Sequence, residues 1–256
     1  VGPLTISLPA KSAMVSASWR TQGWALVSIP ITLSIYSYNG KNMNFWQDHS
    51  PRMLLRSALT AFWFNGWYLG LIVGCSLTLT SHANVMYSST GVYILLLSLV
   101  TCKPVHKLEI FGYIFYGIGV ILMITDPFAT KFGKRPSYLG DLIPFLGAGL
   151  GALFGLMNQQ NLKMFHPFVL MTHWLIFSSL YQLVLIPFIE DNSLFYSQDP
   201  QYGAFGWLHD FETFIYVAGF IVPFTGVLGN TGLICSYMYW PMEVISIVIL
   251  IQPFIA

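Results

Sequence analysis

Long apolar runs, separated by short polar connectors, dominate the pattern along this chain. A helix needs about 20 residues to cross roughly 30 Å of hydrocarbon, and it satisfies its own backbone hydrogen bonds. The pattern therefore predicts a bundle of membrane-spanning α-helices. The eight predicted spans cover roughly residues 19–38, 54–79, 82–102, 108–125, 139–158, 167–189, 212–237 and 241–256.

Composition favours an integral membrane protein and excludes several other classes. Of the 256 residues, 55% are apolar and 8% are charged, whereas a soluble domain has about 25% charged residues. The formal net charge is +1, so nothing indicates a basic surface for nucleic acid. The sequence contains no recognisable nucleophile–base pair and no metal-ligand spacing. We therefore expect neither an enzyme nor a bound cofactor or metal ion.

The charges in the connectors predict the orientation of a multi-pass protein. Cytoplasmic connectors carry an excess of Lys and Arg, and alternate connectors here carry six such residues against four. We expect the richer side to face the cytosol, although the sequence does not indicate which membrane hosts the protein. The richer side has Lys41, Arg52, Arg56, Lys103, Lys107 and Lys163, and the other has Lys11, Lys131, Lys134 and Arg135.

Glycines recur at helix-packing spacing within three of the predicted spans. Small residues in a membrane helix let a neighbouring backbone approach closely. We expect these stripes to face other helices and not lipid. They are Gly66, Gly70 and Gly74, then Gly147, Gly151 and Gly155, and finally Gly226, Gly229 and Gly232.

An internal repeat is indicated by a shift of 160 positions. Under this shift Gly66 falls on Gly226 and Cys75 on Cys235, and the tight turn at 80–82 falls at 240–242. A glycine-striped span, a tight turn and a further span thus recur five spans later. An odd displacement gives the two copies opposite membrane orientations, which is typical of inverted-repeat transporters.

The order of motifs over residues 54–125 is distinctive. It consists of NGWYLGLIVG, a tight turn, TSHANVMYSSTGVYILLLSLV, the polar link KPVHKLE and FGYIFYGIGVILMI. This order resembles the EamA-like family of the drug/metabolite transporter superfamily. Glu109 matches a glutamate common before the family's fifth helix, and Arg20 an arginine often found early in the second. Further on, YLGDLIPFLGAGLGALFG resembles the start of the second repeat, and ILIQPFIA the ninth helix. Tyr93 stands where the family usually has proline, and the connector at 190–211 is long for the family.

The resemblance implies an all-α membrane protein with ten helices in two inverted five-helix repeats. Because the chain starts at Val1 and ends at Ala256 inside an apolar run, we expect a fragment with helices two to nine. The first repeat would cover 1–126, a linker 127–138 and the second repeat 139–256. The implied function is a secondary transporter that moves a small organic metabolite by alternating access. The alternative is a non-transporting membrane subunit that uses this scaffold for assembly, and a homodimer or a membrane complex stays open.

Candidate site residues follow from polar groups within spans, which are costly in lipid and usually face a cavity or a partner. Arg20 could hold an anionic solute with its planar guanidinium, or reach the headgroups as an interfacial arginine. His82 and Glu243 begin spans and could couple transport to a proton, or could stabilise helix starts. By the resemblance, Asn65, Asn84, Tyr87 and Asn230 belong to cavity-lining helices, and hydrogen bonding between helices is the alternative for each.

Overall fold

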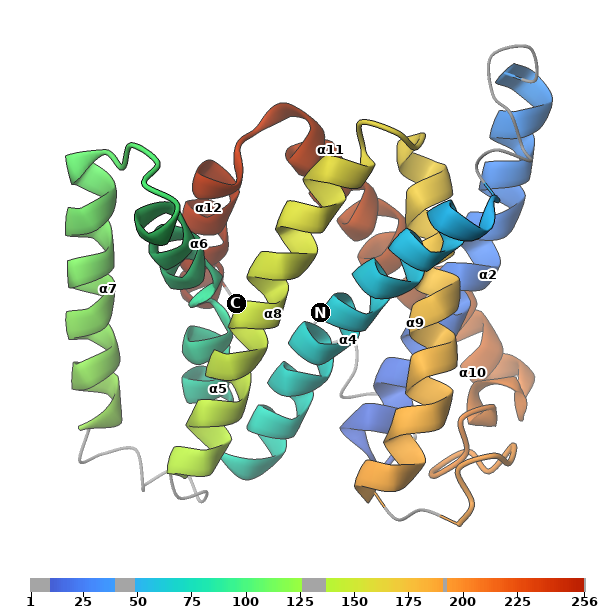
Figure 1. Cartoon of the computed structure of the whole chain (residues 1–256). Coiled ribbons are helices and arrows are strands. Elements are labelled where there is room, and N and C mark those ends of the chain that lie inside the picture. The colour runs from blue at the N-terminus through green and yellow to red at the C-terminus, as the bar shows by residue number, and fades with distance from the viewer. Residues whose placement is uncertain (1–9, 40–48, 126–136, 191–192, 256) are drawn as a thin grey trace. The chain divides into compact units, whose positions relative to one another are not determined.

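The chain folds into helices that form two compact units, which we describe separately (Figure 1). The computed structural model describes residues 10–39, 49–125, 137–190 and 193–255, and every regular element within them is a helix. Unit 1 comprises Val1–Asn65 and Met157–Tyr239, and unit 2 comprises Gly66–Leu156 and Trp240–Ala256. Two helices, α4 (Pro51–Leu77) and α8 (Tyr138–Asn161), continue from one unit into the other.

Unit 1 is built around the long helices α2 (Ala13–Asn39) and α9 (Pro167–Glu190). The chain continues through η2 (Gly206–Leu208), α10 (Phe211–Ile215), the π-helical η3 (Tyr216–Leu228) and α11 (Gly229–Tyr239). Helix α2 packs against α9 and η3, and α11 packs against both of these. Large side chains fill the centre of the unit, among them the fully buried Trp19, Trp174, Ile186 and Ile221.

Unit 2 contains a membrane span that is broken in the middle. The 21-residue span Thr80–Val100 consists of α5 (Thr80–Tyr87) and α6 (Thr90–Val100), which are separated at Ser88 and Ser89. The hydroxyl of Tyr116 on α7 (Lys107–Ile124) donates to the Val85 carbonyl at 2.7 Å and lies 2.6 Å from the Ser89 hydroxyl. Helix α7 packs on α5 and α6, as does α12 (Met242–Ile255).

Five helical segments are long and apolar enough to cross a membrane, which supports the predicted multi-pass protein. They are Pro51–Leu77, Thr80–Val100, Tyr138–Asn161, Pro167–Glu190 and Phe211–Tyr239. The predicted spans 19–38, 108–125 and 241–256 lie in α2, α7 and α12, but these helices are not among the five. One face of α7 exposes a row of large apolar residues, as a lipid-facing helix would: Ile110, Phe111, Ile114, Phe115, Ile118 and Ile121.

The first two glycine stripes face another helix, as predicted. In unit 2 the second part of α4 lies directly against α8, and a Cβ at Gly70 would lie 3.2 Å from the Cα of Gly147. Gly74 faces Pro144, Gly66 faces Leu150, and a Cβ at Gly151 would lie 2.7 Å from the Trp67 ring. Because no side chain separates the two backbones, these helices are in close contact.

The third stripe does not form one packing face, so that part of the prediction is wrong. Gly226 lies against the ring of Trp24 on α2, whereas Gly232 has no neighbour within 4 Å. Gly226 lies in the π-helical η3, whose wider turns contain more residues than an α-helical turn, whereas Gly229 and Gly232 lie in the α-helical α11. Positions that an α-helix would place on one face are therefore rotated away from each other.

The connector after α9 is an ordered part of unit 1 over residues 193–210. Phe195 and Ala204 are buried, and the carboxylate of Asp199 accepts hydrogen bonds from the amides of Gln201 and Tyr202. The connector ends at Asp210, whose carboxyl caps α10. Hydrogen bonds from the amide and hydroxyl of Thr213 lower the pKa of that carboxyl.

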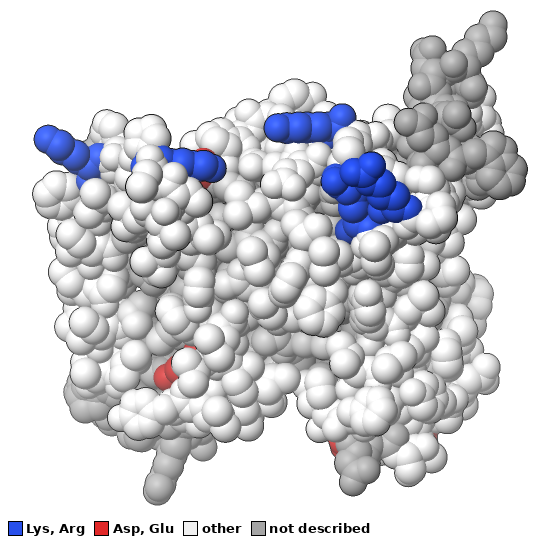
Figure 2. All heavy atoms as spheres, in the orientation of Figure 1, with Lys and Arg blue, Asp and Glu red and all other residues white. Residues whose placement is uncertain are grey.

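The two compact units do not correspond to the two proposed repeats, since each unit contains segments of both repeats. The repeat boundaries therefore stay a prediction. The linker residues 127–136 and Lys41 lie outside the described residues. Within unit 1, Arg52, Arg56 and Lys163 lie at the end where α4 begins, and within unit 2, Lys103 and Lys107 lie where α6 ends and α7 begins. Figure 2 shows the basic side chains at these ends of the units.

Candidate functional site

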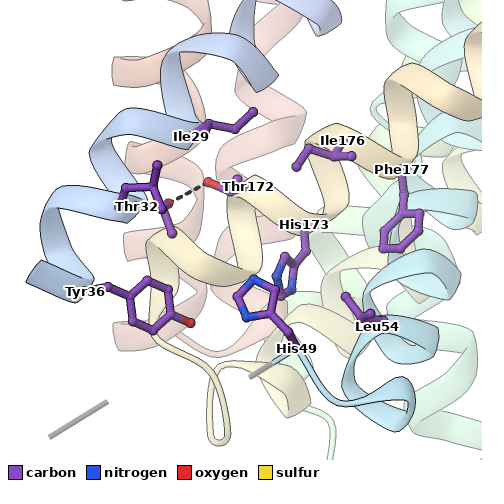
Figure 3. A pocket seen from close by; sticks show the side chains of 10 residues that line it. Ile29, Thr32, Tyr36, His49, Leu54, Thr172, His173, Ile176 and Phe177 are labelled. Atoms are coloured by element: carbon purple, nitrogen blue, oxygen red, sulfur yellow. Dashed lines mark hydrogen bonds between the residues drawn. The ribbon is translucent and has the colours of Figure 1, made fainter. Parts of the chain in front are cut away.

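Unit 1 contains a pocket of about 340 Å³ between α2, α9 and the start of α4 (Figure 3). Its size falls at the lower end of the range for small-molecule sites, roughly 300–1,000 Å³. Aromatic and aliphatic side chains make most of its wall, with a few polar groups. The lining residues are Ile29, Thr32, Leu33, Tyr36, His49, Leu54, Thr172, His173, Ile176 and Phe177.

Two threonines connect the helices on either side of the pocket. The hydroxyls of Thr32 on α2 and Thr172 on α9 lie 2.7 Å apart. The Thr32 hydroxyl also lies 3.2 Å from the Phe168 carbonyl, and that of Thr172 lies 3.2 Å from the Ser28 carbonyl. Either hydroxyl can therefore donate to the other or to a main-chain carbonyl, so this part of the wall can adapt to a hydrogen-bonding ligand.

Two imidazoles lie side by side in the pocket wall. The rings of His49 and His173 meet edge to face with centroids 4.7 Å apart, and the Tyr36 ring lies 6.0 Å from His49. Figure 3 shows His173 reaching in from α9 and His49 from the segment before α4. The Ser57 hydroxyl lies 3.4 Å from Nδ1 of His173, and Nε2 has no hydrogen-bond partner among the described residues. His173 is 5% exposed and its Nε2 is buried, so this nitrogen is shielded from solvent.

The predicted binding residues of unit 1 lie away from this pocket. Arg20 is half-buried on α2, in the third turn and not at the helix start, because α2 begins at Ala13. Residues next to Arg20 in the sequence bond to the connector that follows α9. Trp19 donates to the Gly203 carbonyl, and Gln22 forms hydrogen bonds with Ala204 and Trp207. Whether Arg20 binds an anionic solute remains a prediction.

Asn65 and Asn230 are both buried in unit 1. Asn65 donates to the Ala61 carbonyl and accepts a 3.0 Å hydrogen bond from Gln182 on α9. The second bond joins two helices, and such bonding was the alternative to solute binding for this residue. Asn230, in the first turn of α11, is 7% exposed, and its Nδ2 has no hydrogen-bond partner among the described residues. Of the two, Asn230 has the amide group that a ligand could still engage.

Asn84 and Tyr87 lie on α5 in unit 2. Tyr87 is buried and stacks on Trp67, with centroids 4.8 Å apart and planes inclined by 5°. Asn84 is half-buried, and its carbonyl accepts a hydrogen bond from the Ser88 hydroxyl. Tyr93, which stands where the resembled family has proline, fills a gap beside Gly149 and Phe145.

The proposed coupling residues differ in their surroundings. His82 is in the first turn of α5, 3.4 Å from the Asp141 carboxylate in the first turn of α8. Glu243 is half-buried in the first turn of α12, and its carbonyl accepts from the Ser246 hydroxyl. Within unit 2, α5 and α12 begin at opposite ends (Figure 1). His82 therefore has a buried acidic partner, which was not among the predicted site residues.

The sequence pattern missed two features. Asp141 lies near the start of the predicted span 139–158 and was not chosen as a site residue, and His49 lies in a connector outside the predicted spans, so neither gave a signal of its own. Among the described residues, no cluster of three or more His, Cys, Asp or Glu could hold a metal ion.

No family model, no curated protein and no solved structure matches this chain. The resemblance described above therefore remains a prediction, and the proposals below rest on the geometry of the two units.

Proposed function

We propose that this chain is part of a secondary transporter that moves a small organic metabolite across a membrane by alternating access. The pocket of unit 1 carries the proposal. It lies beside the membrane-spanning segments α4 and α9 and combines an apolar, aromatic wall with a few polar groups, the usual composition of a site for a small organic molecule.

The chemistry of the pocket indicates which solutes to test. An apolar or aromatic body would pack against Ile176, Phe177 and the two imidazole rings. Nε2 of His173 and the two threonines are buried and contribute almost no polar surface to the pocket. Solutes with an apolar or aromatic body are therefore the first to test.

The proposal is tested by placing a larger side chain in the pocket and measuring solute uptake into liposomes. We expect the protein in liposomes to take up at least one class of labelled metabolite, with aromatic and amphipathic compounds tested first. Ile176→Trp places a larger side chain in the pocket and should reduce uptake about tenfold or more, equivalent to about 1.4 kcal/mol. The matched control is Leu180→Trp, which makes a similar change one turn further along α9 at a side chain that is 53% exposed.

Each outcome bears on the proposal. Loss of uptake in Ile176→Trp with uptake retained in Leu180→Trp supports the pocket as the solute site. Equal uptake by both variants and the parent assigns solute binding elsewhere. Liposomes that take up no compound above the protein-free background favour the alternative, a non-transporting membrane subunit.

A further inference from the structure

The buried pair His82 and Asp141 is an ionisable pair within membrane-spanning segments of unit 2. Nδ1 of His82 lies 3.4 Å from Oδ2 of Asp141, and the two side chains are 2% and 8% exposed. The second carboxylate oxygen, Oδ1, is buried and has no hydrogen-bond partner among the described residues. A buried carboxylate that is only half satisfied is costly, so this site favours any change that removes its net charge.

The pair lies next to the closest contact between α8 and the turn that joins α4 to α5. The Thr78 hydroxyl in that turn accepts a 3.2 Å hydrogen bond from the Ser137 amide, just before α8. A Cβ at Gly140 would lie 2.7 Å from the Cβ of Thr78. His82 and Asp141 thus join the same two segments as this contact, and a change in their charge acts directly on the junction.

The described charged groups of unit 2 do not neutralise the pair. Lys103, Lys107, Glu109 and Glu243 lie at the other end of the unit, where α6 ends and where α7 and α12 begin (Figure 1). From α7, the Tyr116 hydroxyl bonds to the Val85 carbonyl and the Ser89 hydroxyl, and the Tyr113 hydroxyl lies 3.2 Å from that of Ser246. The remaining titratable side chains on the elements around the pair are Tyr68 and Cys75 on α4, Tyr87 on α5, Tyr93 on α6 and Tyr138 on α8.

A fixed structural role is the simplest alternative. A carboxylate in the first turn of a helix is stabilised by the helix dipole, and Asp141 is in the first turn of α8. That role needs no histidine, and it leaves Oδ1 without a partner among the residues that the structure describes. A histidine beside the buried carboxylate adds a group that gains or loses a proton near neutral pH.

We propose that His82 and Asp141 together form a proton-binding site. A neutral imidazole and a carboxylate give the pair a net charge of −1, and uptake of one proton from water brings the net charge to zero. The protonated pair holds α5 against α8, and loss of the proton weakens this junction. As a coupling mechanism the inference rests on the proposed transport function, but the binding of the proton does not.

The first test observes the proton directly. In the full chain, purified in detergent and labelled with ¹⁵N-histidine, the ring signals of His82 should pass from neutral to charged between about pH 8 and pH 5. The signal is assigned by its loss in His82→Gln, and independently as the histidine signal most changed by Asp141→Asn. Either variant alone suffices if the other does not fold.

Two variants measure the role of the carboxylate. Asp141→Asn should change the pH dependence of the His82 ring signals, because the ring loses its charged partner. The matched control is Glu109→Gln, which removes a carboxylate from the first turn of α7 and should leave this pH dependence unchanged. A His82 ring that keeps one protonation state throughout this range in the parent protein overturns the proposal.

The second test separates proton binding from transport. If the parent protein takes up solute, an inward proton gradient should increase the rate, and Asp141→Asn should remove the increase while the control variant retains it. A gradient effect that survives in Asp141→Asn overturns the coupling role. A His82 transition in a protein that transports no compound supports the proton site and counts against the proposed transport function.

Discussion

The two parts of α4 contact their neighbours by different means. Residues 51–65, in unit 1, use polar side chains: Thr60 accepts a hydrogen bond from Asn161, and Asn65 accepts one from Gln182. Residues 66–77, in unit 2, use glycines, and Gly70 lies directly against Gly147 of α8. One continuous helix thus has two kinds of contact, which change at the border between the units.

The difference between the two parts of α4 shows that one membrane helix can pack closely over part of its length and leave space for a ligand elsewhere. A glycine contact brings the backbones together and leaves no room between them, whereas helices that meet through side chains can leave a gap for a ligand. The pocket lies in unit 1, where α2 and α9 are joined through Thr32 and Thr172. We therefore expect substitutions in unit 2 to act on stability first, and those around the pocket to act on binding.

The largest expected effect comes from a side chain placed between the backbones of α4 and α8. Gly70→Leu would force the Cα atoms of Gly70 and Gly147 apart, and neither backbone can move aside as a flexible side chain would. We expect a loss of about 3 kcal/mol, which lowers the melting temperature in detergent by roughly 10 °C.

The control for this variant is Gly119→Leu on α7, where no atom lies within 4 Å of the added Cβ. It should change stability by about 0.5 kcal/mol or less. If Gly70→Leu melts at the same temperature as this control, α4 and α8 are not held by the glycine contact, and the comparison between the two parts of α4 fails.

A smaller effect is expected from the polar contact in unit 1. Gln182→Leu removes the donor to Asn65 Oδ1 and leaves that buried oxygen without a partner, at a cost of about 1–3 kcal/mol. The double variant with Asn65→Leu removes both partners and should recover most of the loss. Thermal unfolding of the single and double variants tests this, and a double variant that is less stable than either single one contradicts it.

The smallest effect is expected at the threonine pair beside the pocket. Hydrogen bonds between membrane helices contribute about 0.6 kcal/mol on average. A double-mutant cycle with Thr32→Val and Thr172→Val should therefore give a coupling energy of about that size, measured by unfolding. A coupling energy near 3 kcal/mol would mean that the pair is a principal support of unit 1 and not an adaptable wall of the pocket.

The apolar runs predicted the helices, and the glycine spacing predicted that the first two stripes face other helices, because both patterns depend on residues close together in the sequence. The same spacing misled at Gly232, since nothing in the local pattern indicates that η3 adopts a π-helical turn. The pairing of His82 with Asp141 and of His49 with His173 depends on which helices become neighbours. Asp141 in particular looks like an ordinary acid at the start of a helix until α8 is placed beside α5.

The break at Ser88 and Ser89 has a consequence for how the protein enters the membrane during synthesis. With about 1.5 Å per residue, the 8 residues of α5 and the 11 residues of α6 reach only about 12 Å and 17 Å. Neither piece covers the roughly 30 Å of hydrocarbon alone. The segment α5 also contains His82 and Asn84, so the apolar α6 must provide most of the free energy of insertion for both. Insertion of α5 therefore depends on α6, and we expect a charge introduced into α6 to hinder the insertion of both segments, including the histidine that contacts Asp141.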